Sequence, residues 1–309
     1  MKRMDEKLII KSGYVAILGK PNAGKSTLMN ALLGQKLSIV TSKPQTTRKR
    51  ILGILSEEEY QIIFLDTPGI LEPAYLLQEK MMEDVSLSIQ DADVIIVLLD
   101  VEDDSTGEQT TKDKTISEIL SKNKKPKLLI INKMDLSNQE QIKILINKFE
   151  ANKSFENIIP ISASLGYNTG SVLSAIVELL PVHPKYFPDD IVAQDDERFF
   201  VSEIIREKIF ELYKEEIPYS CEVLIADFKE REEQKNYISA EIVVEKESQK
   251  GIIIGKQGAA IKKLGQSARE AVEEFLQKPV YLDLRVKVRN KWRSDEKMLK
   301  SFGYIRNKE

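Results

Sequence analysis

Eight consecutive residues near the start of the chain have the types and spacing needed to hold a phosphate chain. The run Gly19-Lys-Pro-Asn-Ala-Gly-Lys-Ser26 matches G-x-x-x-x-G-K-[ST] at every position. The glycines let such a loop curl, so that its backbone N–H groups point at a β-phosphate. Lys25 adds a positive charge for the β and γ oxygens, and the Ser26 hydroxyl can be a ligand for Mg²⁺. The run predicts a nucleoside triphosphate site with contacts from Asn22, Ala23, Gly24, Lys25, Ser26 and Thr27.

A second motif has the chemistry to detect the γ-phosphate. Asp66-Thr-Pro-Gly69 follows an apolar run that ends at Leu65. An aspartate at the carboxyl end of a strand can hold Mg²⁺ through water, and the N–H of Gly69 can contact the γ-phosphate. The same residues could form an ordinary turn at the end of a strand. The motif follows a phosphate loop, however, and this order favours a role in nucleotide binding. We expect Asp66 to join Ser26 in holding Mg²⁺, and Gly69 to act with Lys25 in phosphoryl transfer.

Two more short runs carry the chemistry of base recognition. In Asn132-Lys-Met-Asp135, the carboxylate of Asp135 can accept hydrogen bonds from N1–H and N2–H₂ of guanine. Adenine lacks both donors and would leave the carboxylate unpaired, which costs enough to discriminate strongly. We expect Lys133 to cover the base plane with its stem and Asn132 to tie its loop to the phosphate loop. Ser162 and Ala163, after the next apolar run, can offer backbone N–H groups to guanine O6.

These motifs require a parallel sheet whose strands end at one edge. The apolar runs predict six strands, the second and third of which form a hairpin. These strands are expected at 14–18, 51–55, 61–65, 94–99, 127–131 and 158–161. Helical patterns between them, such as 25–33, predict an α/β domain with a mostly parallel six-stranded sheet covered on both faces. Three prolines between 181 and 190 then predict an extended linker. We place the first domain at 1–181, the linker at 182–198 and a smaller α+β domain at 199–309.

The second domain contains a glycine loop of a different kind. Gly255-Lys-Gln-Gly258 leads into a predicted helix over 259–276, and G-x-x-G is the signature of a KH module, which binds about four nucleotides. The expected order, helix-strand-strand-helix-helix-strand, fits the type II KH fold, with strands at 220–228, 237–245 and 280–288. In the last strand Arg285 and Lys287 alternate with apolar residues. We expect RNA contacts from Gly255, Lys256, Gln257, Gly258, Lys262, Lys263, Arg285 and Lys287.

The charge distribution agrees with a local surface for a polyanion. The whole chain carries a net charge of −3, but residues 248–309 hold 15 Lys and Arg against 7 Asp and Glu. The charge distribution by itself is equally compatible with a basic surface that is exposed to solvent and binds no polyanion. The single cysteine, Cys221, and single histidine, His183, argue against disulfides, Cys-rich zinc sites and a Ser-His-Asp triad. The apolar run 94–99 is too short to span a bilayer.

The first domain resembles translation-factor-class GTPases, and the resemblance implies further roles. Such proteins carry a threonine that closes on Mg²⁺ and the γ-phosphate; Thr47 is the favoured residue here and Thr46 the second choice. Ile70 stands where small signalling GTPases have a water-orienting glutamine, and an isoleucine makes no hydrogen bond to water. We therefore expect slow hydrolysis. Asn22 resembles the asparagine that holds K⁺ in several such GTPases, with a loop brace as the equal alternative.

All of these motifs together closely resemble the bacterial Era GTPase family, over essentially the whole chain. The resemblance implies a GTPase that binds the 3′ end of small-subunit (16S) ribosomal RNA and acts in maturation of the 30S subunit, with GTP state controlling RNA binding. It implies a cytoplasmic protein associated peripherally with the inner membrane, and we expect a monomer. One alternative stays open: a non-catalytic RNA-binding protein or membrane-associated nucleotide sensor. A P-loop small-molecule kinase is disfavoured, because it would have no use for the run from Asn132 to Asp135.

Overall fold

The computed structural model describes residues 9–232 and 234–305, and the chain divides into two compact units. The first unit is formed by the residues up to 38 together with 47–71 and 82–194. The second unit is formed by the residues from 195 onward together with two short segments, 39–46 and 72–81. These two segments flank the residues predicted to meet Mg²⁺ and the γ-phosphate, so their membership of the second unit bears on function.

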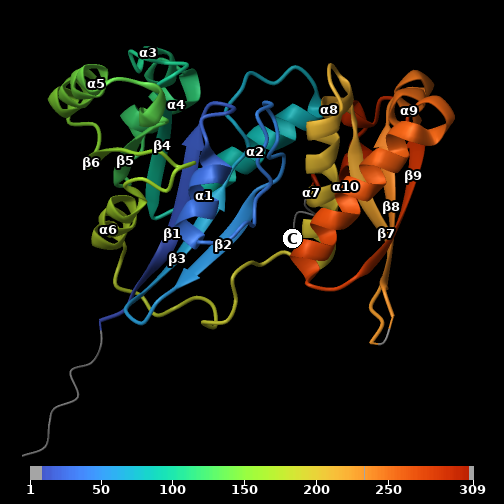
Figure 1. The fold of residues 1–309 in the computed structure, drawn as a ribbon. Helices are drawn as coiled ribbons and strands as arrows, with labels where there is room; N and C mark the ends of the chain where they lie inside the picture. The colour runs from blue at the N-terminus through green and yellow to red at the C-terminus, as the bar shows by residue number, and fades with distance from the viewer. Residues whose placement is uncertain (1–8, 233, 306–309) are drawn as a thin grey trace, which may run out of the picture. The chain divides into compact units, whose positions relative to one another are not determined.

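The first unit is built on a six-stranded sheet in the order β2-β3-β1-β4-β5-β6 (Figure 1). Only β2 runs antiparallel, paired with β3, and the other neighbours are parallel. The predicted hairpin and the mostly parallel six-stranded sheet are confirmed. The strands are β1 (Lys11–Gly19), β2 (Ile51–Ser56), β3 (Tyr60–Asp66), β4 (Val94–Asp100), β5 (Lys127–Asn132) and β6 (Asn157–Pro160).

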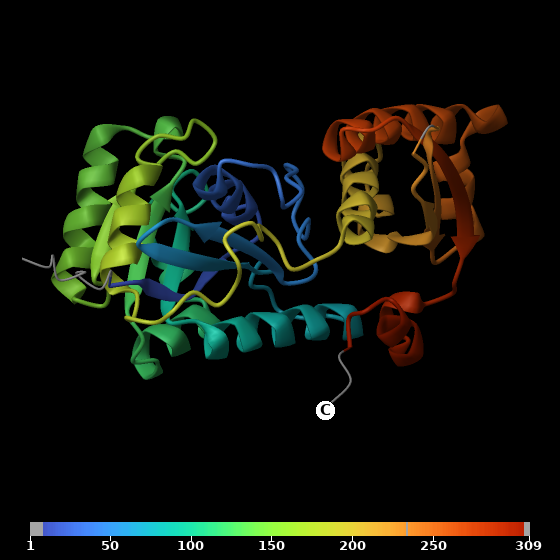
Figure 2. The same ribbon diagram turned by 90° about the horizontal axis from the view of Figure 1, so that it is seen from below.

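Helices cover both faces of this sheet because its central strands are apolar on both sides. Every residue of β4 and β5 is buried. One face packs against α2, α4 and α5 in a single apolar cluster, and α1 and α6 lie on the other (Figures 1 and 2). The helical segments are α1 (Lys25–Leu33), α2 (Leu76–Asp91), α3 (Glu108–Thr111), α4 (Lys114–Lys122), η1 (Met134–Leu136), α5 (Gln139–Asn152) and α6 (Thr169–Leu179).

The second unit places helices on one face of a three-stranded sheet ordered β7-β8-β9. β7 and β8 are antiparallel, whereas β8 and β9 are parallel, and α7, α9 and α10 pack on their inner face around one core (Figure 2). The elements are α7 (Glu197–Leu212), α8 (Ile217–Ser220), β7 (Glu222–Lys229), β8 (Asn236–Val244), α9 (Glu247–Ile254), η2 (Lys256–Gly258), α10 (Ala259–Leu276), β9 (Val280–Val288), η3 (Trp292–Ser294) and α11 (Glu296–Ser301).

The predicted element order is confirmed, with differences at two places. A short helix, α8, ends at Ser220, the first residue of the predicted strand 220–228, so β7 begins at Glu222. Pro218 lies in the first turn of α8, where its missing N–H costs no hydrogen bond. α7 begins at Glu197, where its helical pattern begins, so its first two residues fall within 182–198, the range given to the linker. The helix α11 follows the last strand and was not predicted.

The proline-containing stretch after α6 is extended, but it is bound to the first unit. The side-chain oxygen of Gln61 accepts hydrogen bonds from the backbone N–H groups of Tyr186 and Phe187, at 2.8 and 3.0 Å. Ala193 makes an isolated bridge to Gly53 of β2. The stretch therefore runs along the β2–β3 side of the sheet.

Candidate functional site

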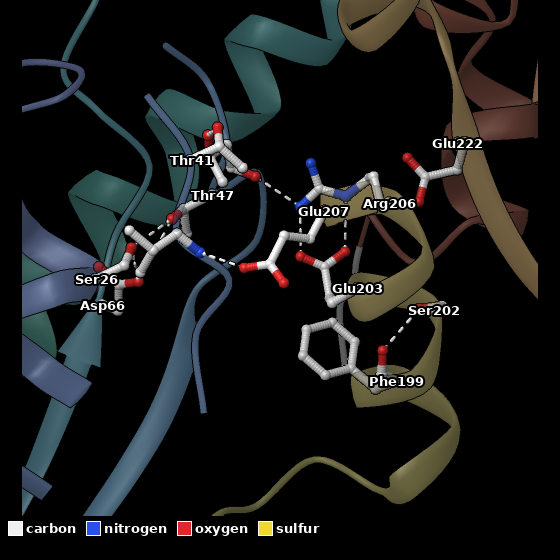
Figure 3. Close-up of polar contacts among 12 residues, drawn as sticks. Ser26, Thr41, Thr47, Asp66, Phe199, Ser202, Glu203, Arg206, Glu207 and Glu222 are labelled. Atoms are coloured by element: carbon white, nitrogen blue, oxygen red, sulfur yellow. Dashed lines mark hydrogen bonds and ion pairs between the residues drawn. The ribbon is translucent and has the colours of Figure 1, made fainter. Parts of the chain in front are cut away.

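Three side chains predicted to hold Mg²⁺ converge at one point of the first unit. The hydroxyl of Ser26, at the start of α1, lies 2.8 Å from the hydroxyl of Thr47 and donates to Asp66 Oδ2 at 2.7 Å (Figure 3). Thr47 Oγ1 lies 3.4 Å from the same carboxylate oxygen. The hydroxyl of Thr46 instead hydrogen-bonds to Thr41 and to the carbonyl of Lys43. The geometry therefore favours Thr47 over Thr46 as the Mg²⁺ ligand.

The set fits a hard divalent cation. The second carboxylate oxygen of Asp66, Oδ1, is buried without a hydrogen-bond partner among the described residues. Burial raises the pKa of the Asp66 carboxyl, while hydrogen bonding by Ser26 and the charge of Lys25 oppose the shift. A cation among one carboxylate and two hydroxyls would stabilise the ionised form, and oxygen ligands are what Mg²⁺ prefers. Ser38, which sequence analysis missed, is fully buried and also lowers the pKa of this carboxyl.

The phosphate loop has the backbone shape that its glycines predict. Gly24 has φ 93°, and a Cβ there would lie 2.3 Å from the side-chain nitrogen of Asn132. Lys25 is 6% exposed, and its ammonium donates to the Lys20 carbonyl across the loop at 2.8 Å. Burial lowers the pKa of Lys25 to about 8, with Asp66 opposing the shift. Phosphate oxygens would offer this buried cation further anionic partners besides Asp66.

The loop after β3 packs directly against the phosphate loop. A Cβ on Gly69 would lie 2.7 Å from backbone atoms of Pro21, so only glycine fits there. The Ile70 N–H donates to the Gly19 carbonyl at 3.0 Å. The Ile70 side chain is 3% exposed and belongs to the apolar cluster under the sheet. It therefore packs in the core.

This burial leads to a prediction for Ile70→Ala. Truncating a buried isoleucine should lower the free energy of unfolding by about 2–4 kcal/mol, whereas the rate of GTP hydrolysis per folded molecule should stay close to that of the parent chain. Denaturant unfolding and single-turnover hydrolysis measure the two effects. Ile116→Ala, in the same cluster on α4, is the matched control. A rate loss well beyond that of the control would assign Ile70 a part in hydrolysis.

Asn132 links the base-recognition loops to the phosphate loop, as expected. Its side-chain nitrogen donates to the Ala23 carbonyl at 2.8 Å, and its side-chain oxygen accepts from the Ala163 N–H at 3.0 Å. Asn132 ends β5 and is 2% exposed. One buried amide thus holds three loops together, and the run from Ser162 to Ser164 lies beside the phosphate loop for this reason.

Lys133 and Asp135 follow Asn132 in a tight turn. Lys133 has φ 61°, and its ammonium pairs with Asp100 at 2.5 Å and Glu102 at 3.3 Å. The Lys133 stem is thereby fixed beside the end of β4. Asp135 lies in η1 with an exposed side chain. The carboxylate is open to a ligand, as recognition of guanine would require.

The G-x-x-G loop of the second unit has the predicted form. Gly255 and Gly258 have φ 72° and 78°, and Gln257 between them has φ 52°. A Cβ on Gly255 would lie 2.9 Å from the backbone nitrogen of Ala260, whereas a Cβ on Gly258 meets nothing within 4 Å. Lys256 and Gln257 are exposed in η2. The loop therefore presents bare backbone on its open side.

A groove of about 530 Å³ lies between α10 and β9. Its helix wall includes Lys262, Gly265 and Arg269, spaced so that they share one face of α10. Leu282 and Leu284 form part of the strand wall. Apolar strand residues opposite basic helix residues suit bases on one side and phosphates on the other.

Arg285, Lys287 and Lys263 were predicted as RNA contacts but do not line this groove. Arg285 and Lys287 alternate with inward-facing leucine and valine residues of β9, so they lie on the opposite face of the sheet. Arg285 pairs with Asp283 at 2.9 Å, and Lys287 pairs with Glu241. Lys263 is exposed on α10 but does not line the groove. Of the predicted RNA contacts, Lys262 lines the groove, and the G-x-x-G loop lies immediately before the helix that forms its wall.

Comparison with known proteins places both units. Residues 14–133 match the family model described as 50S ribosome-binding GTPase, and residues 216–293 match that of the KH domain. The chain is 47% identical over 300 residues to the chloroplastic GTPase ERA1 of Zea mays, covering 95% of this chain and 70% of the relative. It is 43% identical to the GTPase Era of Clostridium kluyveri, covering 96% and 100%. The chain belongs to the Era GTPase family.

A solved Era structure agrees with the fold over nearly the whole chain. It superposes with a TM-score of 0.88 at 39% identity and covers 96% of this chain and 99% of that one. That protein was crystallised in complex with MgGDPNP and nucleotides 1506–1542 of 16S ribosomal RNA. The predicted family and its two-part fold are therefore confirmed. Among the described residues, no helix is long and apolar enough to cross a membrane.

The groove between α10 and β9 is also lined by residues that were not among the predicted RNA contacts. Lys235, Arg269 and Tyr281 line it, yet none adjoins the G-x-x-G loop in sequence. Arg269 lies seven residues after Lys262, two helical turns along the same face of α10, so helical periodicity could have found it. Lys235 precedes β8, and only the tertiary fold brings it to the groove.

Proposed function

We propose that the chain binds GTP with Mg²⁺, hydrolyses it slowly, and binds the 3′ end of small-subunit ribosomal RNA during assembly of the 30S subunit. Residues 1–181 would form the nucleotide-binding domain and residues 199–309 the RNA-binding domain. Residues 182–198 would link these two domains. The observation that carries the proposal is the convergence of Ser26, Thr47 and Asp66 beside a buried lysine. A cytoplasmic location, with peripheral contact to the inner membrane through the basic C-terminal region, belongs to the same proposal.

The chain's own residues would divide the work of phosphoryl transfer. Ser26, Thr47 and Asp66 would hold Mg²⁺, which when bound neutralises charge on the β- and γ-phosphate oxygens. Lys25 would place a fixed positive charge on the same oxygens, and the Gly69 N–H would donate to the γ-phosphate. Asn132 keeps the base-recognition loops in register with the phosphate loop. Because Ile70 is buried in the core, the rate should depend on positioning and charge.

The RNA part of the proposal is supported by the groove between α10 and β9. Lys235, Lys262 and Arg269 supply positive charge along it, and the G-x-x-G loop lies at the start of the same helix. The helix N-terminus adds a partial positive charge where phosphates would pass. Apolar Ile261, Leu282 and Leu284 leave room for bases rather than for a duplex.

The test is hydrolysis and binding on the full chain. GTP turnover is measured with and without 30S subunits, and binding of an RNA oligonucleotide from the 3′ end of 16S ribosomal RNA is compared with a scrambled sequence. The proposal expects turnover with Mg²⁺ and preference for the authentic oligonucleotide. Absence of turnover with tight RNA binding would favour the non-catalytic alternative, and equal affinity for both oligonucleotides would contradict sequence recognition.

We also propose that Asn22 holds K⁺ beside the phosphates. Asn22 is an exposed residue of the phosphate loop with φ 64°. A monovalent cation there would stabilise transition-state charge as an arginine finger does. Replacing K⁺ by Na⁺ at constant ionic strength should slow hydrolysis about tenfold or more. Asn22→Ala should be slow in both salts, and equal wild-type rates would leave Asn22 as a loop brace.

A further inference from the structure

The segment 39–46 leads directly into Thr47, and it is held by α7 of the second unit. The segment is described throughout and forms no helix or strand of its own. The backbone N–H of Val40 donates to Glu207 Oε1 at 2.9 Å. The Lys43 ammonium donates to two carbonyls at the carboxyl-terminal end of α7, where a cation is favoured. The segment's path is therefore set by groups of α7.

The last contact of the segment is made by a buried arginine. Arg206 Nη2 donates to the backbone carbonyl of Thr46 at 2.6 Å (Figure 3). Only 1% of Arg206 is exposed, and its Nε donates to Glu203 Oε1 at 2.8 Å, with a second bond from Nη2 to the same carboxylate. The ring of Phe210 lies 5.5 Å from the guanidinium carbon. Because the planar guanidinium is fixed by these partners, its bond to Thr46 has one geometry.

Two consecutive residues are thus held by different partners. Thr46 is held through its carbonyl by Arg206, while Thr47 places its hydroxyl beside Ser26 and Asp66. Consecutive Cα atoms are only ~3.8 Å apart. A shift of the Thr46 carbonyl must therefore shift the Thr47 hydroxyl. Coordination of Mg²⁺ is sensitive to such shifts, because the ion demands nearly ideal octahedral geometry.

We propose that Arg206 is a positioning residue for Thr47, and that Glu203 fixes Arg206 for this role. The proposal rests on the proposed function, because it assigns Thr47 to the Mg²⁺ of bound GTP. A threonine of this kind is recruited by the γ-phosphate and its Mg²⁺ and is released with GDP. Loss of Arg206 should therefore weaken binding of GTP and leave binding of GDP unchanged. A residue that only stabilised the fold would affect both nucleotides alike.

The experiment compares Arg206→Met, Arg206→Lys and wild type as full-length chains. Affinities for GDPNP and for GDP are measured over a Mg²⁺ titration, beside thermal unfolding. Arg206→Met should lower GDPNP affinity about tenfold at limiting Mg²⁺ and raise the Mg²⁺ concentration needed for half-maximal binding. GDP affinity should not change. Arg206→Lys, which keeps the charge and one donor for the Thr46 carbonyl, should restore part of the loss.

Two further variants make the result decisive. Arg198→Met removes an exposed arginine from the first turn of the same helix and should leave both affinities unchanged. If Arg206→Met does not fold, Lys43→Met loosens the same segment and should shift the GDPNP to GDP ratio in the same direction. An unchanged ratio in folded variants, or equal losses for both nucleotides, would overturn the role of Arg206. Failure of the wild type to bind GTP would instead contradict the proposed function.

Discussion

Replacing Asp135 by asparagine is expected to shift the base preference from guanine toward xanthine. Asp135 is exposed in η1, two residues after Lys133, whose ammonium pairs with Asp100 and Glu102. Asn132, one residue earlier, is held by the Ala23 carbonyl. Its carboxylate can accept from both N1–H and the 2-amino group of guanine. Asparagine would set its donor against that amino group, whereas xanthine presents an oxygen there. The variant should lose roughly 2–4 kcal/mol of binding to GTP relative to XTP.

Direct binding of GTP and XTP to the parent chain and the variant measures this shift. Asp113→Asn is the matched control, because Asp113 caps α4 and asparagine caps a helix equally well. The control should keep the parent preference for GTP. A variant at position 135 that still preferred GTP to XTP by the parent ratio would refute the assignment of Asp135. RNA binding should be unaffected in both variants, which provides a check on folding.

The elements that position the nucleotide could be predicted from the sequence because their signals are local and strong. Continuous apolar runs marked the strands, and α1 and α10 have the predicted bounds. Each nucleotide motif follows a strand of a parallel sheet, and the carboxyl ends of parallel strands meet at one edge. The meeting of Ser26 with Asp66, or of Asn132 with Ala23, thus follows from topology once the strands are known.

What could not be predicted depends on contacts remote in sequence. Arg206 and Glu203 stand three residues apart on a helix, a spacing that usually marks a weak surface ion pair. Yet both are buried, and Arg206 donates to the carbonyl of Thr46, 160 residues earlier in the chain. Trp292 is likewise buried, with its ring nitrogen donating to the Ser220 carbonyl at 3.0 Å, although it follows a run of basic residues. Local patterns carry no information about such partners.

The predicted RNA contacts stay predictions, but the structure shows where their side chains lie relative to the groove between α10 and β9. Alternation along β9 was predicted, and it is this alternation that puts Arg285 and Lys287 on the face away from α10. The number of Lys and Arg residues in the segment 248–309 is therefore a poor guide to how many of them line the groove. Arg269 was recoverable from helical spacing, whereas Lys235 was not. A cluster of charges in the sequence indicates which helix or strand carries a basic surface. Which face of that element the charged side chains occupy depends on tertiary packing.

Gly258→Asp is expected to abolish most of the RNA binding while leaving the fold and the nucleotide site intact. A Cβ on Gly258 meets nothing within 4 Å, so the carboxylate would project into open space where phosphates must pass. Its φ of 78° adds a strain of roughly 1–2 kcal/mol. Repulsion and steric exclusion should together weaken the affinity tenfold or more, which corresponds to about 1.4 kcal/mol for each phosphate that the loop can no longer bind. GTP affinity should not change.

Gly34→Asp is the control, because Gly34 has φ 67°, open space around its Cβ and a place at the end of α1. It carries the same charge and a similar strain, and should keep RNA binding.

Gly265→Ala separates steric exclusion from charge, since its methyl group would enter the groove 3.7 Å from Leu284 Cδ1, while alanine favours the helix by ~1 kcal/mol. It should weaken RNA binding without lowering stability. Fluorescence binding of the 16S 3′-end oligonucleotide is the measurement. Undiminished affinity in Gly258→Asp would contradict the assignment of this loop to RNA, and the basic segment would then be better explained as a general polyanion or membrane surface.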